Sequence, residues 1–376
     1  MSPDHGPEPG PEPQAGGRPG LRTGWTTGTC ASAAAKAALV GLLTGRAPAD
    51  VEVGLPDGRR VAFPVDRPTE EDGVGSAVGA PNRCVVVKDA GDDPDCTDGA
   101  RMTAVVDWAA GSQTELRAGP GVGVVTRPGL GLAVGGPSIT DVPRRMILAA
   151  LAEVSDRPVV VTFTVPGGEE MAARTSNQRL GIVGGISILG TTGVVKPFST
   201  AAYRASVVQQ IDVAAAQGMP MVVLATGTRS DAFAQRRFPD LDPVCFVEVG
   251  DFTGVALRRC AADGVRRVCW VGMAGKLTKL AAGVMMTHFR SSKVDTELLA
   301  SVAREAGAPD EVVVAATETS TARHFFEVCV AAGEIEPWRR LCERAVVACR
   351  AHVGDVEFDV EVVCTDFDGA REVARA

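Results

Sequence analysis

The second half of the chain repeats one pattern, in which a short apolar run ends in a glycine and a helix-forming segment follows. The runs MVVLATG, VCFVEVG and RRVCWVG end at Gly227, Gly250 and Gly272. Parallel sheets with crossover helices have this pattern, so it predicts a Rossmann-like α/β domain with a mainly parallel sheet over residues 199–376. Because such sheets bind ligands beyond the carboxyl ends of their strands, we expect the glycine turns to form one rim.

The first half, residues 21–198, is predicted to be a strand-rich α+β domain. Asp57 and Gly58 separate two alternating apolar runs between residues 51 and 65, which is a strong hairpin signal. Further short apolar runs occupy residues 84–87, 102–106 and 159–165. One helix is expected from about Val142 to Glu153, with Asp141 as its cap and Pro143 in its first turn.

Composition narrows the range of partners. The chain has 376 residues, 45% hydrophobic and 22% charged, with a net charge of −8. This balance argues against nucleic acid, which needs a concentrated basic surface. Arginine doublets such as Arg144–Arg145 and Arg266–Arg267 leave a small polyanionic ligand open, although a solvated face is the commoner meaning of such doublets.

Cysteine usage and the termini bear on localisation. The ten cysteines contain no CxxC pair, so neither a zinc site nor a disulfide framework is predicted and a reducing cytoplasm is expected. Residues 1–20 are rich in proline, glycine and glutamate, which predicts a disordered tail rather than a signal peptide. The apolar stretch 180–195 is too short and too glycine-rich for a membrane span, so no membrane partner is expected. A homo-oligomer is compatible with these features.

A threonine-rich turn, GWTTGTC at residues 24–30, precedes an alanine-rich segment that is predicted to be a helix. The unbonded N–H groups of a first helical turn, together with the threonine hydroxyls, suit an anionic ligand. The alternative, which local physics favours, is an ordinary N-cap with Thr27 or Thr29 closing the helix start. Cys30 is either an acidified thiolate at this terminus or a small buried residue, and the second interpretation is favoured.

The turn around Gly272 imitates a phosphate loop incompletely. Two residues separate Gly272 from Gly275, and Leu277 rather than a hydroxyl residue follows Lys276. This spacing supports neither ATP hydrolysis nor a dinucleotide fingerprint. What is left is a helix N-terminus with a lysine beside it, which can hold a carboxylate.

The segment KDAGDDPDCTDG at residues 88–99 concentrates five aspartates after a predicted strand. Its spacing does not match an EF-hand loop, and a solvated turn is favoured over a site where one or two carboxylates face a bound cation. Unless a positive group lies nearby, some of these carboxylates should have raised pKa values.

Two other segments allow both a structural and a functional interpretation. Residues 176–197 hold five glycines among branched apolar residues, which indicates close approach of the backbone to another strand or to a flat ligand. His288 lies near Arg290 and Lys293. On its own, such a histidine is more often a satisfied or surface residue than a catalytic one.

Six segments, taken together, carry a resemblance to a known family. They are LRTGWTTGTCASAAAKAA, KDAGDDPD, GPGVGVVTRPGL, VPRRMI, RLGIVGGISILGTTGVVKPFS and GKLTKLAAG. In this order, between about Leu21 and Asp295, they resemble the CbiD family of cobalt-precorrin-5B C1-methyltransferases of anaerobic cobalamin biosynthesis. The last stretch of roughly eighty residues contributes no motif to the resemblance.

The resemblance implies methyl transfer from S-adenosylmethionine to ring carbon C1 of a cobalt-bearing tetrapyrrole, giving cobalt-precorrin-6A. Asp89, Asp92 or Asp93 would face the amine or the hydroxyls of the donor, while the Thr26–Thr29 turn or the Gly272 turn would receive an anion. No metal ligand is expected, because the cobalt arrives with the substrate, and no catalytic residue is assigned. The binding residues expected on this basis are Arg22, Thr26, Thr27, Thr29, Asp89, Asp92, Asp93, Gly250, Asp251, Gly272, Gly275, Lys276 and His288.

Two positions depart from the family pattern. Asp251 stands where the family commonly has asparagine, and Met273 where it commonly has histidine. An aspartate can still hydrogen-bond a ribose, whereas methionine transfers no proton.

The chemistry that the resemblance implies requires no strong base, so alignment of the two ligands and exclusion of water should supply most of the rate. Two other functions stay open at this stage. One is a methyltransferase or reductase that acts on another intermediate. The other is a corrinoid-binding protein without catalytic activity, which would not bind the methyl donor.

Overall fold

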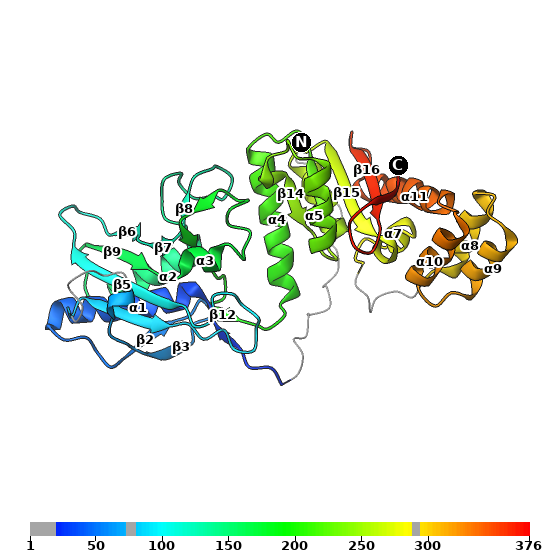
Figure 1. The fold of residues 1–376 in the computed structure, drawn as a ribbon. Helices are drawn as coiled ribbons and strands as arrows, with labels where there is room; N and C mark the ends of the chain where they lie inside the picture. Colours follow the sequence, from blue (N-terminus) through cyan, green and yellow to red (C-terminus); the bar gives the residue numbers. More distant parts are fainter. Residues whose placement is uncertain (1–19, 73–79, 288–293) are drawn as a thin grey trace. The chain divides into compact units, whose positions relative to one another are not determined.

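The computed structural model describes residues 20–72, 80–287 and 294–376, and it divides into two compact units (Figure 1). Unit 1 comprises the described residues up to Thr126, together with Val134–Gln178 and Ile182–Tyr203. Unit 2 comprises Arg127–Ala133, Arg179–Gly181 and Arg204–Ala376. Almost all of the predicted N-terminal tail lies outside the described residues.

Unit 1 is built around a buried helix, α1 (Thr27–Thr44), which packs on α2 (Asp141–Ala152) and on a four-stranded sheet. Its alanines between Ala31 and Ala38 are all fully buried, and their small side chains let the helix lie close to the strands. The sheet has the order β4-β5-β9-β6, and only β6 and β9 are parallel. Its strands are β4 (Arg83–Val87), β5 (Arg101–Trp108), β9 (Val159–Thr164) and β6 (Glu115–Ala118).

The predicted hairpin is confirmed. Strands β2 (Asp50–Gly54) and β3 (Arg60–Pro64) pair antiparallel on either side of the Asp57-Gly58 turn. Gly58 has a φ of +86°, a conformation that glycine adopts without strain. The Asp57 carboxylate accepts a hydrogen bond from the Arg59 N–H at 3.0 Å, which closes the turn.

The predicted caps of α1 and α2 are each wrong by one or more residues. Thr26, rather than Thr27 or Thr29, caps α1, and its hydroxyl accepts from the Thr29 N–H at 3.2 Å. In α2 the cap is Thr140, and Asp141 lies in the first turn. At α1 the reason is tertiary, because the hydroxyls of Thr27 and Thr29 hydrogen-bond to backbone carbonyls more than 150 residues away in the sequence.

Among the five glycines of residues 176–197, Gly185 marks a close approach to another strand, whereas Gly184 has open space around it. A Cβ built on Gly185 would lie 2.0 Å from the backbone of Gly121, so only glycine fits where these two segments meet. The pairs formed here are short: β11 (Gly185–Ile186) with β7 (Gly121–Val122), β10 (Ile182–Val183) with β8 (Val124–Val125), and β12 (Val194–Val195) with β1 (Gly24–Trp25).

Unit 2 contains a five-stranded sheet of order β14-β13-β15-β16-β17, in which only the edge strand β17 is antiparallel. The predicted mixture of helices and strands is therefore confirmed, with sheets of mixed orientation in the chain. The strands are β14 (Phe246–Glu248), β13 (Val222–Ala225), β15 (Arg267–Met273), β16 (Asp359–Thr365) and β17 (Glu372–Arg375).

The strand order of this sheet reverses between β13 and β15, because the chain steps from β13 to β14 on one side and then to β15 on the other. The connecting helices are α5 (Thr228–Arg237) after β13, α6 (Thr253–Ala262) after β14 and α7 (Ala274–Ala281) after β15. Gly272 lies inside β15 rather than in the turn where it was expected, so the turn begins at Met273.

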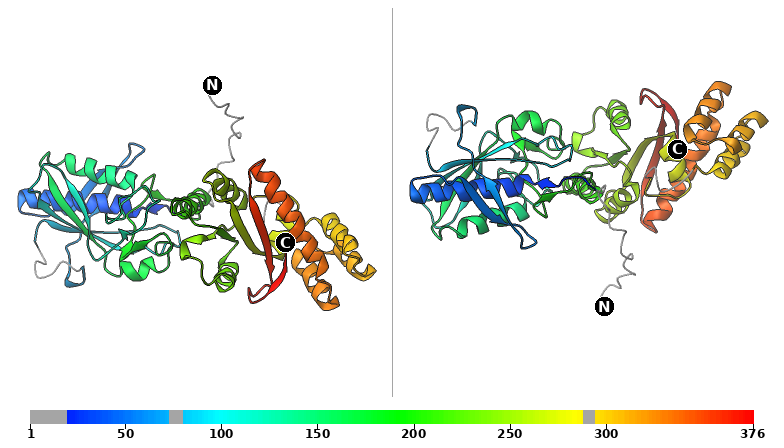
Figure 2. Two further views of the ribbon diagram at one scale, coloured as in Figure 1. Left: turned by 90° about the horizontal axis from the view of Figure 1, so that it is seen from above. Right: turned by 90° about the horizontal axis from the view of Figure 1, so that it is seen from below.

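The remaining helices come before β13 or after α7 in the sequence. Helix α4 (Thr200–Ala216) precedes β13, and a short helix, α3 (Gly168–Ala172), belongs to unit 1. Three helices follow: α8 (Thr296–Glu305), α9 (Asp310–Glu318) and α10 (Ala322–Ala332). Helix α9 packs on α8 and on α10, while α8 also packs on α11 (Glu336–Val353) and α10 on α7. Both views of Figure 2 show this orange group beside α11, which itself packs on β16.

Candidate functional site

The carboxyl ends of β13, β14 and β15 form one rim in unit 2, and Lys276 of α7 ties it together. The Lys276 ammonium donates to the Thr226 carbonyl at 2.8 Å and to the Gly250 carbonyl at 3.0 Å. It also forms an ion pair with Asp251, with an Nζ–Oδ1 distance of 3.3 Å. An ammonium group has three N–H donors, and these three acceptors can use all of them. Lys276 therefore joins the loop after β13 to the loop after β14.

Asp251 is held on a second side by Thr287. The Thr287 hydroxyl lies 3.2 Å from the Asp251 carboxylate, and the Thr287 N–H donates to the Asp251 carbonyl at 3.1 Å. The predicted residues Gly250, Asp251 and Lys276 thus lie together in this structure. His288, predicted for the same function, lies outside the described residues.

The glycines of the rim have different structural roles. A Cβ on Gly272 would lie 2.3 Å from the Trp270 ring, so the packing of a fully buried tryptophan requires this glycine. A Cβ on Gly227 or on Gly275 would meet no atom within 4 Å. Gly227 has an extended φ of 166°, and Gly275 lies in the first turn of α7, so neither conformation requires glycine. At Gly227 and Gly275, therefore, a side chain would have room, and neither packing nor backbone conformation explains why these residues are glycines.

Three residues that the sequence analysis did not identify lie near this rim. Arg179 makes a bidentate pair with Asp231 of α5, at 3.0 and 2.6 Å, and also donates to the Phe246 carbonyl at 3.2 Å. Glu248 is the last residue of β14, and burial, together with the charge of Asp231, raises the pKa of its carboxyl group. A carboxylate at the end of an apolar strand is visible in the sequence, but the pairing of Arg179 with Asp231 has no local signal.

The threonines of the N-terminal turn bind protein groups within unit 1. The Thr27 hydroxyl lies 3.1 Å from the Ser187 carbonyl and accepts from the Leu189 N–H at 2.9 Å. The Thr29 hydroxyl donates to the Gly193 carbonyl at 2.7 Å. These hydroxyls hold the start of α1 against the glycine-rich segment.

Replacing Thr27 by valine is expected to lower the free energy of unfolding by about 1–3 kcal/mol, because the part-buried Leu189 N–H loses its acceptor and the buried Thr27 hydroxyl is removed. Thr44→Val is the matched control, since that hydroxyl bonds only to exposed backbone of its own helix end, and it should change stability by less than about 0.5 kcal/mol. Urea unfolding of both variants measures the difference. A Thr27→Val variant as stable as the wild type would show that the hydroxyl has no structural role.

The aspartates of residues 88–99 are engaged by groups of unit 1. Arg22 pairs through its guanidinium with Asp89, and its backbone N–H donates to Asp92 at 2.6 Å. The hydrogen bond from Arg22 lowers the pKa of Asp89, with a smaller contribution from the Gly91 N–H. Asp93 accepts from the Phe198 N–H at 2.8 Å. The guanidinium of Arg22 is therefore a positive group close to these aspartates, and it lowers the pKa of Asp89 rather than leaving it raised.

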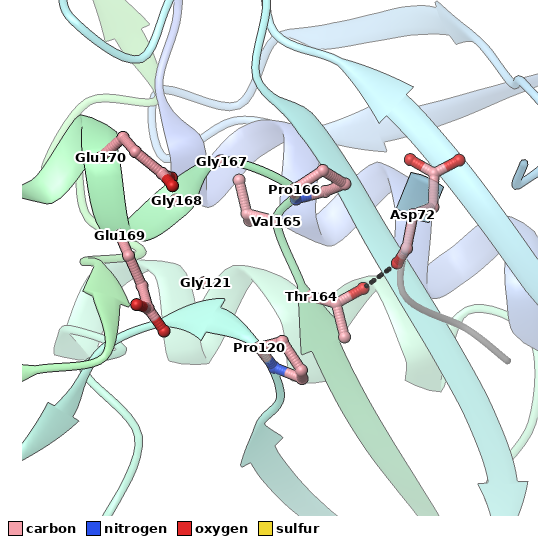
Figure 3. A pocket seen from close by; sticks show the side chains of 10 residues that line it. All are labelled: Asp72, Pro120, Gly121, Thr164, Val165, Pro166, Gly167, Gly168, Glu169 and Glu170. Atoms are coloured by element: carbon pink, nitrogen blue, oxygen red, sulfur yellow. Dashed lines mark hydrogen bonds between the residues drawn. The ribbon is translucent and has the colours of Figure 1, made fainter. Parts of the chain in front are cut away.

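Unit 1 also contains a pocket of about 210 Å³ that none of the predicted site residues line (Figure 3). Its walls include Asp72, Glu169 and Glu170, and the Thr164 hydroxyl donates across it to the Asp72 carbonyl at 3.1 Å. The short helix α3 begins at this pocket, and the buried carboxylate of Asp72 is paired with Arg101 at 2.8 Å.

Cys30 is fully buried, and burial raises the pKa of its thiol to about 12, so the interpretation as a small buried residue is confirmed. Within the described ranges, no three side chains of histidine, cysteine, aspartate or glutamate are grouped as a metal ion would require. None of the helices in the described part of the chain combines the length and the apolar character needed to cross a bilayer.

A largely parallel sheet whose strand order reverses beside an open rim is typical of α/β proteins that bind a small ligand at the strand ends. The chain belongs to the CbiD family. The sequence profile of CbiD matches residues 14–197, and that of the CbiD C-terminal domain matches residues 286–375. The second match corrects the expectation from the motifs, because the last part of the chain also belongs to the family.

Named relatives and a solved structure match this chain over most of its length. Cobalt-precorrin-5B C(1)-methyltransferase of Salinispora arenicola is 56% identical, over 89% of this chain and 87% of the relative. The protein of the same name from Rubrobacter xylanophilus is 54% identical, over 87% of this chain and 84% of the relative. The crystal structure of a cobalamin biosynthesis protein (cbiD) from Archaeoglobus fulgidus is 25% identical over 83% of this chain and 85% of that chain, with a TM-score of 0.38.

Proposed function

We propose that this chain methylates carbon C1 of cobalt-precorrin-5B, with S-adenosylmethionine as the donor and cobalt-precorrin-6A as the product, in the cytoplasm. The name shared by relatives that are 54–56% identical over most of both chains supports this activity. Methylation of carbon requires an activated methyl group, and the sulfonium of S-adenosylmethionine carries one, which supports this donor. The cobalt ion belongs to the substrate.

Unit 2, in this proposal, is a Rossmann-like domain that binds the donor at the rim. The observation that carries the proposal is the pair of open glycines, Gly227 before α5 and Gly275 in the first turn of α7, which follow β13 and β15. These two strands flank the point where the strand order reverses, which is where ligands bind in open α/β sheets. Each glycine lies at the start of a helix, where backbone N–H groups favour a carboxylate such as that of the donor.

The rim contributes to the reaction by orienting the donor. As the methyl group moves from sulfur to carbon, the C–S bond breaks with its electrons returning to sulfur, and the positive charge on sulfur disappears. Lys276 fixes the separation of the loops after β13 and β14 through the Thr226 and Gly250 carbonyls, so the donor meets a preformed surface. Alignment and exclusion of water, rather than proton transfer by a side chain, then supply most of the rate.

Gly275→Ala is expected to weaken binding of S-adenosylhomocysteine about tenfold, which corresponds to about 1.4 kcal/mol, because a methyl group enters the space proposed for the donor. Stability should not fall, since alanine in a helix is favoured over glycine by up to about 1 kcal/mol. Calorimetric titration and thermal unfolding measure the two effects. Gly111→Ala, at a glycine that is equally open but lies in unit 1, should leave the affinity unchanged. Wild-type affinity in Gly275→Ala would place the donor elsewhere.

The activity itself is tested by incubating the purified chain with cobalt-precorrin-5B and S-adenosylmethionine carrying a labelled methyl group. The product should gain one labelled methyl at C1. A chain that retains the corrinoid, but neither binds S-adenosylhomocysteine nor transfers the label, would instead be a corrinoid-binding protein.

A further inference from the structure

We infer that unit 1 binds the tetrapyrrole substrate beside the starts of α1 and α2, where Leu189 contacts the ring and Arg144 and Arg145 bind its carboxylate groups. The inference rests on the proposed function and adds a second ligand site to it, for the other of the two reactants. None of these three residues belongs to the binding set expected from the sequence, although the arginine doublet left a polyanionic ligand open.

Hydrogen bonds fix the backbone of Leu189 between the two helix starts. Its N–H donates to the Thr27 hydroxyl at 2.9 Å, and its carbonyl accepts from the Gly28 N–H at 3.1 Å. The carbonyl of the preceding residue, Ile188, accepts from the N–H of Thr140, the cap of α2, at 3.0 Å. A side chain on backbone that is already fixed loses less freedom when a ligand covers it, which favours binding.

The two helix starts are in contact with one another. A Cβ built on Gly28 would lie 2.6 Å from the Pro143 ring, so a larger residue there would push α2 away from α1. Pro143 directly precedes Arg144, which brings the arginine to the place where the two helices meet.

The glycine-rich segment exposes large apolar side chains at three positions. Val183, Leu189 and Phe198 are 57%, 49% and 55% exposed. Single exposed apolar residues are common on proteins, but three in one short segment are a reason to expect a ligand or a partner there. Of the three, Leu189 is the one that follows the hydrogen bond to the cap of α2.

The charges of Arg144 and Arg145 are not compensated by acidic side chains. Both residues are exposed, and within the described ranges neither guanidinium forms an ion pair or a hydrogen bond. Asp141 precedes them at the i, i+3 and i, i+4 spacings where helix ion pairs form, yet it pairs with neither. Helical side chains lean toward the helix N-terminus, so Arg144, one turn after Thr140, is directed toward the end of α2 where Leu189 lies.

The chemistry of this surface matches a tetrapyrrole that carries carboxylate side chains. The ring has two apolar faces, which an exposed leucine can cover, and carboxylates at its edge, which guanidinium groups bind through paired hydrogen bonds. The methyl donor suits the surface less well, because its sulfonium and its ammonium group would both be repelled by the arginines.

The test measures binding of cobalt-precorrin-5B, followed by its visible absorption, and of S-adenosylhomocysteine to the same proteins. We expect Arg144→Gln with Arg145→Gln to weaken tetrapyrrole binding about tenfold or more and to reduce its dependence on salt, because two charge-assisted contacts are lost. Leu189→Ser should weaken it about threefold to tenfold, since the ring then covers less apolar surface. S-Adenosylhomocysteine should bind these variants as it binds the wild type.

Matched controls come from the other end of α1. Leu43 is 47% exposed, and Arg46 is exposed without an ion-pair partner in the part of the chain that the structure describes. Leu43→Ser and Arg46→Gln therefore remove the same kinds of side chain far from the proposed surface. Both should bind the tetrapyrrole as the wild type does.

The outcomes separate this inference from the proposed function. If the wild type binds the tetrapyrrole and the variants at Leu189, Arg144 and Arg145 bind it equally well, the inference is overturned and the proposed function still stands. Equal losses in the control variants, or a parallel loss of S-adenosylhomocysteine binding, would also overturn it, because the effect would not be specific to this surface. A wild type that does not bind the tetrapyrrole would overturn the proposed function, and the inference with it.

Discussion

Asp95→Ala is expected to lower the free energy of unfolding by about 3–5 kcal/mol, which is the usual cost of leaving one partner of a buried ion pair alone. The Lys88 side chain is only 1% exposed, and its ammonium lies 2.7 Å from the Asp95 carboxylate. Without that carboxylate, the ammonium stays in the interior with its charge uncompensated. Replacing both residues, as in Lys88→Met with Asp95→Ala, should recover much of the loss, because no charge then remains buried.

The pH dependence of stability offers an independent check on this pair. Burial by itself would raise the pKa of Asp95, but the hydrogen bond and charge of Lys88, with help from Thr97, outweigh it and hold that pKa below its usual value. A carboxylate with a lowered pKa in the folded state stabilises the protein above its unfolded pKa of about 4, and this contribution is lost as the pH falls through the lowered value. Asp95→Ala should therefore flatten the acid limb of the stability curve.

An exposed ion pair provides the control for these measurements. Arg117 and Glu115 are paired with 57% and 55% of their side chains exposed, so Glu115→Ala should cost less than about 1 kcal/mol. Urea unfolding between pH 3 and 7 gives both quantities. A loss below 1 kcal/mol for Asp95→Ala would mean that the ammonium finds another partner or gives up its proton.

Gly121→Ala is expected to cost about 2–5 kcal/mol, because the substitution is disfavoured by two independent effects. Gly121 has a φ of +78°, which an alanine adopts only with strain, and its Cβ would lie 1.9 Å from the Val165 carbonyl oxygen. That carbonyl belongs to backbone, which cannot swing aside as a side chain would. The short pairing of β7 with β11 and the wall of the pocket in Figure 3 both depend on this glycine.

Gly99→Ala separates the two effects. Gly99 has a similar φ of +72°, but a Cβ there would meet nothing within 4 Å. The free energy of unfolding of Gly99→Ala should therefore fall only by the cost of the positive φ, about 1–2 kcal/mol. Urea unfolding of the two variants measures the difference between them. Equal losses would show that the β7–β11 contact relaxes to accommodate the methyl group.

Sequence patterns predicted the strands and turns that are specified by residues adjacent in the chain. The apolar runs before Gly227 and Gly250 became β13 and β14, and the Asp57-Gly58 turn became a hairpin. The cap of α1 was misplaced because Thr27 and Thr29 bond to residues 187–193, which no local pattern reveals. Gly272 was taken for a turn residue, although the packing of the Trp270 ring explains it.

The candidate site was predictable only in part, for the same reason. Gly275 and Lys276 stood out as a helix start after an apolar run, but the acceptors of Lys276 come from two other loops. The reversal of strand order depends on which strands are neighbours, and sequence patterns predict the strands without their order. Strands β16 and β17, which complete the sheet, come from the part of the chain where no family motif was found.

A crystal structure of this chain with S-adenosylhomocysteine bound tests the central claim most directly. The account predicts that the ligand lies at the rim of unit 2, with the carboxylate of its amino-acid part near the helix starts at Gly227 or Gly275. A ligand bound instead in unit 1, against the Thr26–Thr29 turn or among Asp89, Asp92 and Asp93, would contradict the account.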